Sequence, residues 1–232
     1  MKKIVLVLLV FLFNLSVAQA KTFYADGNKL EKRVALTFDD GPGKATEKIL
    51  EILKQKEVKA TFFMLGVNVV DNPSLAKAVL DAGHEIANHT YRHINFYAYI
   101  NEDKDLKMEK EILQAESVIE NILGIKTFLV RFPYGYAKQD SIQVASKLGY
   151  YVINWSFGTD WQNMPANEMY LKYKNAISNG AIFLMHDLFK NEKIISFLGD
   201  FIDDIKNRGY EIVTVSQLLD IKNPNAEQQW RY

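Results

Sequence analysis

The sequence predicts an α/β protein of one domain, a deformed (β/α) barrel with about seven parallel strands. Short apolar runs rich in β-branched and aromatic residues alternate with longer helical patterns along the 232 residues of the chain. Such alternation is typical of a parallel sheet, because a crossover helix usually joins each parallel pair of strands. No internal repeat or linker interrupts the pattern before the polar tail that follows Ile221. A single closed or nearly closed barrel is therefore favoured over two domains.

The first twenty residues have the pattern of a secretory signal. Two lysines at positions 2 and 3 precede an apolar run over residues 4–13, and residues 18–20 (Ala-Gln-Ala) have the small-x-small pattern after which signal peptidases cut. The run is short for a membrane span, which needs about 20 apolar residues. We expect residues 1–20 to be removed and residues 21–232 to form one folded domain, secreted or periplasmic, with no stable insertion in a membrane.

Seven segments of the remaining chain have a strand pattern and seven have a helix pattern. The predicted strands are Val34–Phe38, Ala60–Met64, Glu85–Ala87, Thr127–Val130, Tyr151–Trp155, Ala181–Leu184 and Glu211–Val213. The predicted helices are Ala45–Lys56, Pro73–Ala82, Asp105–Leu123, Lys138–Leu148, Ala166–Ser178, Ile194–Arg208 and Val215–Asp220. Glycine stops several of the helical patterns, as expected at helix C-termini: Gly83, Gly124, Gly149, Gly180 and Gly209.

Charge and cysteine content exclude some classes of protein. The full chain has 28 basic and 28 acidic residues, and loss of the two signal lysines leaves 26 basic residues, so the mature chain is close to neutral. This balance gives no support to nucleic-acid binding. The chain has no cysteine, so stability must come from a hydrophobic core and not from disulfides.

Polar residues gather where the predicted strands end. Catalytic groups of α/β barrels lie at the C-terminal ends of the strands, so residues far apart in sequence would share one rim. The residues that follow strands are Asp39 and Asp40, His89 and His93, Arg131, Asp160 and Trp161, and His186 with Asp187. For Asp187 we expect the ordinary role of a helix N-cap.

The segment VALTFDDGPG, Val34 to Gly43, ends a buried strand on two adjacent carboxylates. Ionised carboxylates are costly away from water unless they are paired or bound to a metal. A plain turn does not require both acids, because Gly-Pro-Gly already supplies it. Adjacent residues of an extended chain point to opposite sides, so one of Asp39 and Asp40 could bind a metal while the other faces a reacting water.

His89 and His93 lie four residues apart, a spacing that on one helical turn aims both imidazoles the same way. Such a pair alone also occurs in cores and on surfaces. With a carboxylate from a neighbouring strand end, however, it makes three ligands with open positions for water and substrate. Zinc-dependent hydrolysis is then the leading chemistry. His84, a single histidine beside a strand, is expected to be structural.

Five ordered motifs resemble those of the polysaccharide deacetylases, the NodB-like carbohydrate esterases. They are TFDDGP (Thr37–Pro42), HTYRH (His89–His93), RFPY (Arg131–Tyr134), DW (Asp160-Trp161) and LMH (Leu184–His186). The resemblance extends from Arg33 to Leu219, and the five motifs in order are specific although no single one is. In the fourth motif, Phe157 occupies a position where the family often has a polar residue, which puts polar support around Asp160 in doubt.

The resemblance implies a metal site and a general base. Asp40, His89 and His93 would hold a divalent metal, with zinc preferred and cobalt or nickel as alternatives. Asp39 would act as the general base that activates the attacking water, and Arg131 would pair with it and orient it.

The resemblance also implies an acid and a substrate pocket. His186 would protonate the departing amine. Asp160 would raise the pKa of the His186 imidazole so that a proton is available near neutral pH. The backbone N–H of Tyr134 would contribute to an oxyanion hole. Leu184 and Trp161 would line the pocket for the acetyl group and the sugar.

The implied activity is an exported metal-dependent N-deacetylase of N-acetylglucosamine residues in peptidoglycan or chitin-type oligosaccharides. The second Asp of TFDDGP favours that substrate over N-acetylmuramic acid. One alternative is an O-acetyl esterase of xylan-type polysaccharide. A sugar-binding protein without catalysis would not need a base, its Arg partner and an acid, and an iron oxygenase with the same ligand types usually has a jelly-roll fold.

Overall fold

The structure, a computed structural model, describes residues 22–224, so the predicted signal segment lies outside the described residues. The strands are β1 (Phe23–Tyr24), β2 (Arg33–Asp39), β3 (Thr61–Met64), β4 (Glu85–Asn88), β5 (Leu129–Val130), β6 (Tyr151–Ile153), β7 (Ile182–His186) and β8 (Glu211–Val213). The helices are α1 (Thr46–Gln55), α2 (Gly66–Asp71), α3 (Pro73–Asp81), α4 (Lys104–Leu123), the 3-10 turn η1 (Pro133–Gly135), α5 (Gln139–Lys147), α6 (Ala166–Asn175), α7 (Glu192–Asn207) and α8 (Val215–Leu218).

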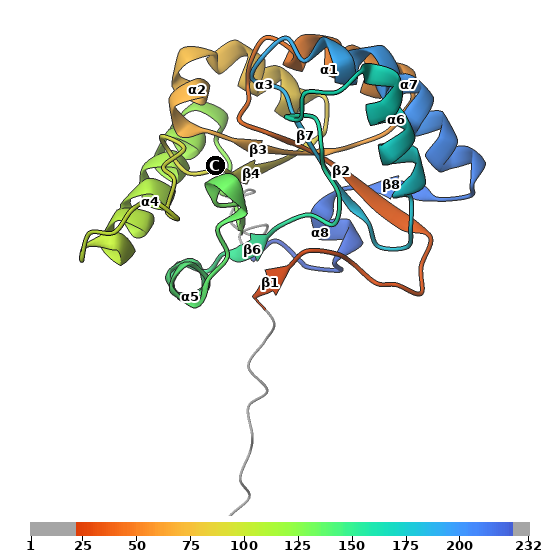
Figure 1. The fold of residues 1–232 in the computed structure, drawn as a ribbon. Helices are drawn as coiled ribbons and strands as arrows, with labels where there is room; N and C mark the ends of the chain where they lie inside the picture. Colours follow the sequence, from red (N-terminus) through yellow and green to blue (C-terminus); the bar gives the residue numbers. More distant parts are fainter. Residues whose placement is uncertain (1–21, 225–232) are drawn as a thin grey trace, which may run out of the picture.

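The strands form one sheet with helices packed around it (Figure 1). The order is β1-β6-β5-β4-β3-β2-β7, β8 pairs with the start of β2, and every pairing in the described sheet is parallel. Phe157, in the loop after β6, makes an isolated parallel bridge to Phe183 in β7, so the segment after β6 lies beside the last strand of the sheet order. The predicted single-domain, deformed (β/α) barrel is confirmed.

Alternate side chains of strand β2 belong to cores on opposite faces of the sheet. Val34, Leu36 and Phe38 belong to the core between the sheet and its helices, whereas Ala35 belongs to a separate core on the other face. Because side chains alternate along a strand, Asp39 lies on the same face as Ala35, at the carboxyl end. The Asp39 carboxylate, at the end of β2, therefore lies on the interior side of the barrel rim.

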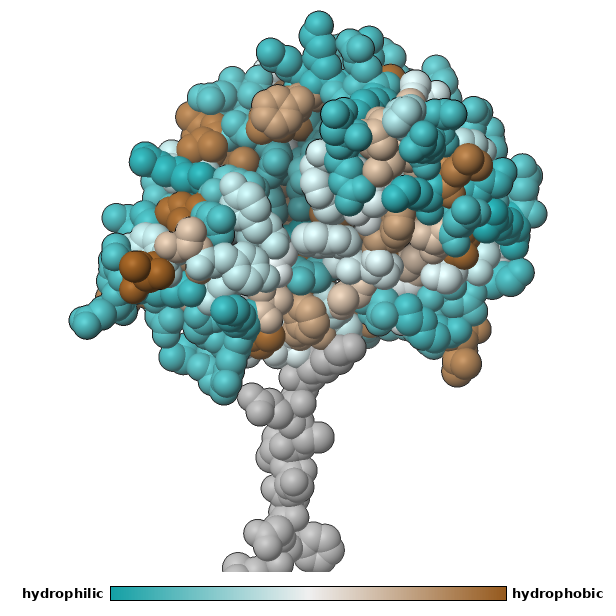
Figure 2. Space-filling view, viewed as in Figure 1, coloured by the Kyte–Doolittle hydropathy of each residue, from teal (hydrophilic) through white to brown (hydrophobic). Residues whose placement is uncertain are grey.

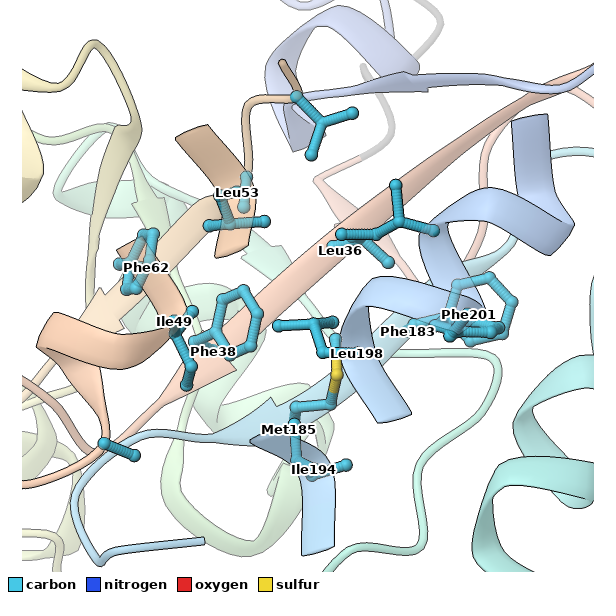
Figure 3. Close-up of a cluster of buried hydrophobic side chains, with 14 of the residues drawn as sticks. Leu36, Phe38, Ile49, Leu53, Phe62, Phe183, Met185, Ile194, Leu198 and Phe201 are labelled. Atoms are coloured by element: carbon cyan, nitrogen blue, oxygen red, sulfur yellow. The ribbon is translucent and has the colours of Figure 1, made fainter. Parts of the chain in front are cut away.

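Helices α1 and α7 cover the outer face of β2 and β7. Figure 3 shows Ile49 and Leu53 of α1 and Leu198 and Phe201 of α7 among the strand residues of this core. Burial of each such side chain contributes about 1.5–3 kcal/mol. The packed helices hold β2 beside β7 in a register that places Asp39 opposite His186.

Five elements differ from the sequence predictions. β1 and α2 were not predicted, because two residues of strand and six of helix are too short to show a clear period. The predicted strand over Thr127–Val130 begins only at Leu129, since the N–H and hydroxyl of Thr127 bond to the Glu116 carboxylate. β6 ends at Ile153, two residues early, and β7 extends to His186.

The surface in the view of Figure 2 is mainly hydrophilic, with hydrophobic residues in small separate groups. Among residues 22–224, none of the helices combines the length and the apolar character that crossing a membrane requires.

Candidate active site

A cavity of about 540 Å³ opens at the carboxyl ends of the strands. Its lining brings together residues from six regions of the chain: Asp39, Asp40, His89, His93, Tyr134, Gly135, Trp155, Asp160, Trp161, Leu184, His186, Phe189 and Asn191. Nine of the ten residues proposed from the sequence motifs are in this lining. The tenth, Arg131, is fully buried directly behind it.

Asp40, His89 and His93 form a cluster in which one ligand atom of each residue lies within 4.8 Å of the others. Asp40 Oδ1 is 3.2 Å from His89 Nε2 and 3.1 Å from His93 Nε2. Burial acts to raise the pKa of the Asp40 carboxyl, but contacts with the two imidazoles outweigh burial and lower it. Asp40 Oδ1 is also buried without a hydrogen-bond partner among the described residues. An unsatisfied anionic oxygen facing two imidazole nitrogens fits a divalent metal.

The local backbone that builds this cluster differs from the one the sequence suggested. His89 and His93 do not lie on a helical turn; they lie in the loop after β4, where His93 has a φ of 57°. Asp40 is not extended either, because its φ is 71°. This left-handed conformation turns Asp40 back toward the cavity, so both carboxylates of the pair line the same site.

Two buried residues not singled out from the sequence support the histidine loop. The Glu111 carboxylate of α4 accepts the backbone N–H groups of Tyr91 (3.1 Å) and Arg92 (2.7 Å). Asn88 Oδ1 accepts the N–H of Thr90 at 2.8 Å. Glu111 lies among buried apolar residues on one face of α4. A charged residue on an apolar helix face is unusual, and this feature of the sequence could have indicated its role.

A hydrogen bond to the backbone of Arg131 orients the His89 imidazole. Its Nδ1 lies 2.7 Å from the backbone carbonyl of Arg131, so Nδ1 donates and Nε2 is the ring nitrogen directed at Asp40. A hydrogen bond of this kind holds a metal-ligating imidazole in the required tautomer.

Arg131 binds Asp39 from inside the barrel. Its Nη1 donates to Asp39 Oδ1 at 2.6 Å and to Thr37 Oγ1 at 2.9 Å. Nε and Nη2 donate to the backbone carbonyls of Ile153 and Asn154. The guanidinium is therefore held by four acceptors, and it in turn fixes one oxygen of a carboxylate whose other oxygen lies 3.8 Å from His89 Nε2.

His186 and Asp160 form a second pair across the cavity. His186 Nδ1 donates to Asp160 Oδ1 at 2.9 Å, and the His186 backbone N–H donates to Oδ2 at 2.8 Å. Burial acts to lower the pKa of His186, but the hydrogen bond and charge of Asp160, with the charges of Asp39 and Asp40, raise it to about 9. The imidazole is thus protonated at neutral pH, with Nε2 left to act on a bound molecule.

Asn191 is a further residue of this region that the sequence did not reveal. Its Nδ2 donates to Asp160 Oδ2 at 2.8 Å and to the backbone carbonyl of His186 at 2.7 Å. An Asn ahead of a helix pattern indicates an ordinary cap, so no signal pointed to the site. Asn191 supplies the polar support for Asp160 that Phe157 cannot give, and Phe157 instead packs edge-on against Tyr173.

The three residues expected to contact substrate differ in exposure. Leu184 is buried in β7, whereas Tyr134 and Trp161 are 59% and 55% exposed, and all three residues line the cavity. The Tyr134 ring lies 4.9 Å from the His93 ring, and the Trp161 ring lies 5.8 Å from the His186 ring, centroid to centroid. The aromatic groups therefore flank the cluster and the acid pair on separate sides.

Two other residues discussed from the sequence have structural surroundings. His84 is buried, accepts the Ala60 N–H, and has a pKa lowered to about 4 by burial and by Lys59. The expectation that Asp187 caps the following helix is wrong, because the N-cap of α7 is Asn191. Asp187 is instead buried and accepts the hydroxyl of Thr46, the first residue of α1.

An α/β barrel with a carboxylate-histidine cluster, a guanidinium-bound carboxylate and a carboxylate-bound imidazole is the arrangement of a hydrolase. Residues 26–153 match the family model described as polysaccharide deacetylase. The chain is 38% identical over 200 residues to a peptidoglycan-N-acetylglucosamine deacetylase of Bacillus cereus, covering 83% of this chain and 91% of the relative. The chain therefore belongs to the polysaccharide deacetylase family, which confirms the resemblance carried by the five motifs.

A solved structure and a longer, bifunctional relative extend the comparison. The crystal structure of the Bc1960 peptidoglycan N-acetylglucosamine deacetylase matches with a TM-score of 0.81 and 30% identity, covering 87% of this chain and 94% of that one. A bifunctional xylanase/deacetylase of Pseudobutyrivibrio xylanivorans is 33% identical over 201 residues, covering 85% of this chain. The match spans only 32% of that relative.

Proposed function

We propose that this protein is an exported, metal-dependent polysaccharide N-deacetylase that removes acetyl groups from N-acetylglucosamine residues of peptidoglycan or chitin-type oligosaccharides. The observation that carries the proposal is the convergence on one cavity of a metal-type cluster, a base candidate and an acid candidate. The names of the Bacillus cereus relative and of Bc1960 support the substrate class.

Asp40, His89 and His93 would hold the metal, with zinc preferred and cobalt or nickel able to replace it. A metal there would polarise the acetyl carbonyl and lower the pKa of a water beside it. Asp39, fixed by Arg131, would take a proton from the water as its oxygen attacks the carbonyl carbon. The backbone N–H of Tyr134 would stabilise the oxyanion that forms.

Breakage of the C–N bond needs a proton on nitrogen, because an amide anion is a poor leaving group. His186, protonated and held by Asp160, would give its Nε2 proton to that nitrogen. The products are acetate and a free amine on the sugar. Leu184 and Trp161 would contact the acetyl methyl and the sugar ring.

The test is incubation of the purified protein with chitooligosaccharides, peptidoglycan and acetylated xylan, measuring acetate and free amine together. The proposal predicts equal amounts of acetate and amine from N-acetylglucosamine polymers. Acetate without amine, released from xylan alone, would support the second candidate, an O-acetyl esterase. The similarity to a bifunctional xylanase/deacetylase favours including that substrate.

Export and the domain limits are part of the proposal. Residues 1–20 would act as the signal and residues 21–232 as the mature catalytic domain, secreted or periplasmic. Expression of the full chain followed by N-terminal sequencing of the exported protein tests this, and a protein that begins at Lys21 is expected. An intracellular protein that retains residues 1–20 would contradict it.

A further inference from the structure

Asn191 bridges three segments that meet at the acid pair. It stands immediately before α7, and its side-chain Nδ2 donates to Asp160 in the loop after β6 and to the backbone carbonyl of His186 at the end of β7. Asn191 also lines the cavity. A single amide group therefore connects the side chain that would orient the acid with the backbone that carries the acid.

The local conformation of Asn191 is not explained by its place at the start of a helix. Asn is a favoured N-cap because its side-chain oxygen accepts an N–H of the first turn, with the cap residue in an extended conformation. At the N-terminus of α7 no such side-chain bond occurs, and Asn191 has a φ of 37° and a ψ of 48°. Asn191 therefore makes no cap bond and has a left-handed conformation. Its side chain instead makes the two hydrogen bonds at the acid pair.

The hydrogen bonds of Asp160 show what Asn191 adds. The Asp160 side chain is 1% exposed, so its charge depends on donors within the protein. Oδ1 accepts His186 Nδ1, and Oδ2 accepts the His186 N–H and Asn191 Nδ2. Two of the three donors belong to His186 itself. Of these three donors, Asn191 Nδ2 is the one that does not belong to His186. It can therefore hold the Asp160 carboxylate independently of the imidazole that Asp160 orients.

We infer that Asn191 is a positioning residue for the acid step: it holds the Asp160 carboxylate in the orientation that directs His186 at the departing nitrogen. This inference rests on the proposed deacetylase function. It predicts that loss of the Asn191 amide impairs the step in which the amine is protonated more than it impairs binding of the polysaccharide.

The experiment compares Asn191→Gly and Asn191→Asp with the parent on a chitooligosaccharide and on an activated acetate ester. Gly accepts the left-handed backbone, and Asp keeps the shape but replaces the donor with a second carboxylate. We expect kcat on the amide to fall about 10- to 100-fold with little change in KM, and a smaller loss on the ester. Lys190→Gly, which loosens the same loop without touching the pair, is the matched control and should keep parental kinetics.

A double-mutant cycle separates positioning from structure. In a His186→Ala background, Asn191→Gly should reduce the remaining activity less than about 2-fold, because the group it positions is gone. Equal losses in both backgrounds, or a rise in KM alone, would overturn the inference.

A readout independent of turnover distinguishes failure of this inference from failure of the proposed function. The His186 Nδ1–H proton, followed by NMR in the whole protein, should shift in both Asn191 variants and not in Lys190→Gly. If the parent deacetylates none of the polymers, the proposed function fails while this signal still reports on Asn191. An unchanged Nδ1–H signal in folded Asn191→Gly and Asn191→Asp proteins would refute the positioning role.

Discussion

At the scale of single residues, Arg131 has both a structural role in the buried core and a role in holding the proposed base. It is fully buried, yet its guanidinium is neutralised by Asp39 and satisfied by Thr37 and two backbone carbonyls. A buried charge with all these partners is costly to disturb, because each acceptor left behind loses its donor. The same contacts hold Asp39 at the cavity, so stability and activity should depend on Arg131 together.

Arg131→Lys tests this double role. Lysine keeps the charge but cannot reproduce the planar fork that reaches four acceptors, so we expect turnover to fall at least about 100-fold and the free energy of unfolding to fall by about 3–5 kcal/mol. Kinetics and urea unfolding measure the two effects. Arg208→Lys, at an exposed position, is the control and should change neither. A fully active Arg131→Lys protein would mean that the fork is not needed.

Loss of the proposed base and loss of a proposed metal ligand should have different effects. Asp39→Asn should keep the metal and lose turnover by about 10²–10⁴-fold, because the proposed base is gone while the ligands remain. His89→Ala should lose the metal itself. Metal analysis beside kinetics distinguishes them, and an Asp39→Asn protein with full turnover would show that the base is another group.

The pH dependence of the acid pair has a defined sign. Protonated His186 is the active form, and its pKa is raised to about 9 against an ordinary value of 6.5, so activity on the amide should fall as the pH rises through about 9. Asp160→Asn removes the charge that raises this pKa, and the alkaline limb should move toward 6.5. The same protonation favours the folded state, and that stabilisation is fully present below 6.5 and lost as the pH rises through 9. An alkaline limb that does not move in Asp160→Asn would contradict the assignment.

At the scale of elements, helix α4 supports the loop that carries the histidines. Glu111→Leu removes the carboxylate oxygen, Oε2, that accepts both the Tyr91 and the Arg92 backbone N–H, and we expect zinc affinity to weaken by about 10- to 100-fold. The free energy of unfolding of the metal-free protein should fall by about 1–3 kcal/mol. Glu111→Gln keeps an acceptor oxygen and is the matched control, expected to lie close to the parent. Calorimetric titration that finds parental zinc affinity in Glu111→Leu would show that the loop is held by other contacts.

The elements that sequence reasoning found are those with a clear period. The continuous apolar run of β2 and the long amphipathic pattern of α4 are local properties, so the parallel α/β architecture and the position of the rim could be expected. The left-handed Asp40 and the irregular histidine loop depend on contacts with distant segments, and their conformations were not predicted. Glu111 accepts N–H groups 20 and 19 positions away, and Asn191 donates to Asp160 31 positions away, and no local sequence pattern indicates such bonds.

At the scale of the whole molecule, the barrel brings separate segments to one cavity. The last residue of β2 and the residue after it contribute the two carboxylates, the loop after β4 contributes the histidines, and β7 contributes the proposed acid. Asp39 and His186 are in register on adjacent strands. The helices α1 and α7 pack against the outer face of these two strands (Figures 1 and 3). The proposed deacetylation requires a metal held by Asp40, His89 and His93.

The most direct measurement is a zinc titration of the metal-free protein, with amine release from a chitooligosaccharide followed at each addition. We expect no activity at the start, a linear rise, and a break at about one zinc per chain, as for a single site with three protein ligands. His89→Ala should show no rise at matched zinc. Full amine release by protein whose metal has been removed and whose metal content has been measured as zero would contradict the claim.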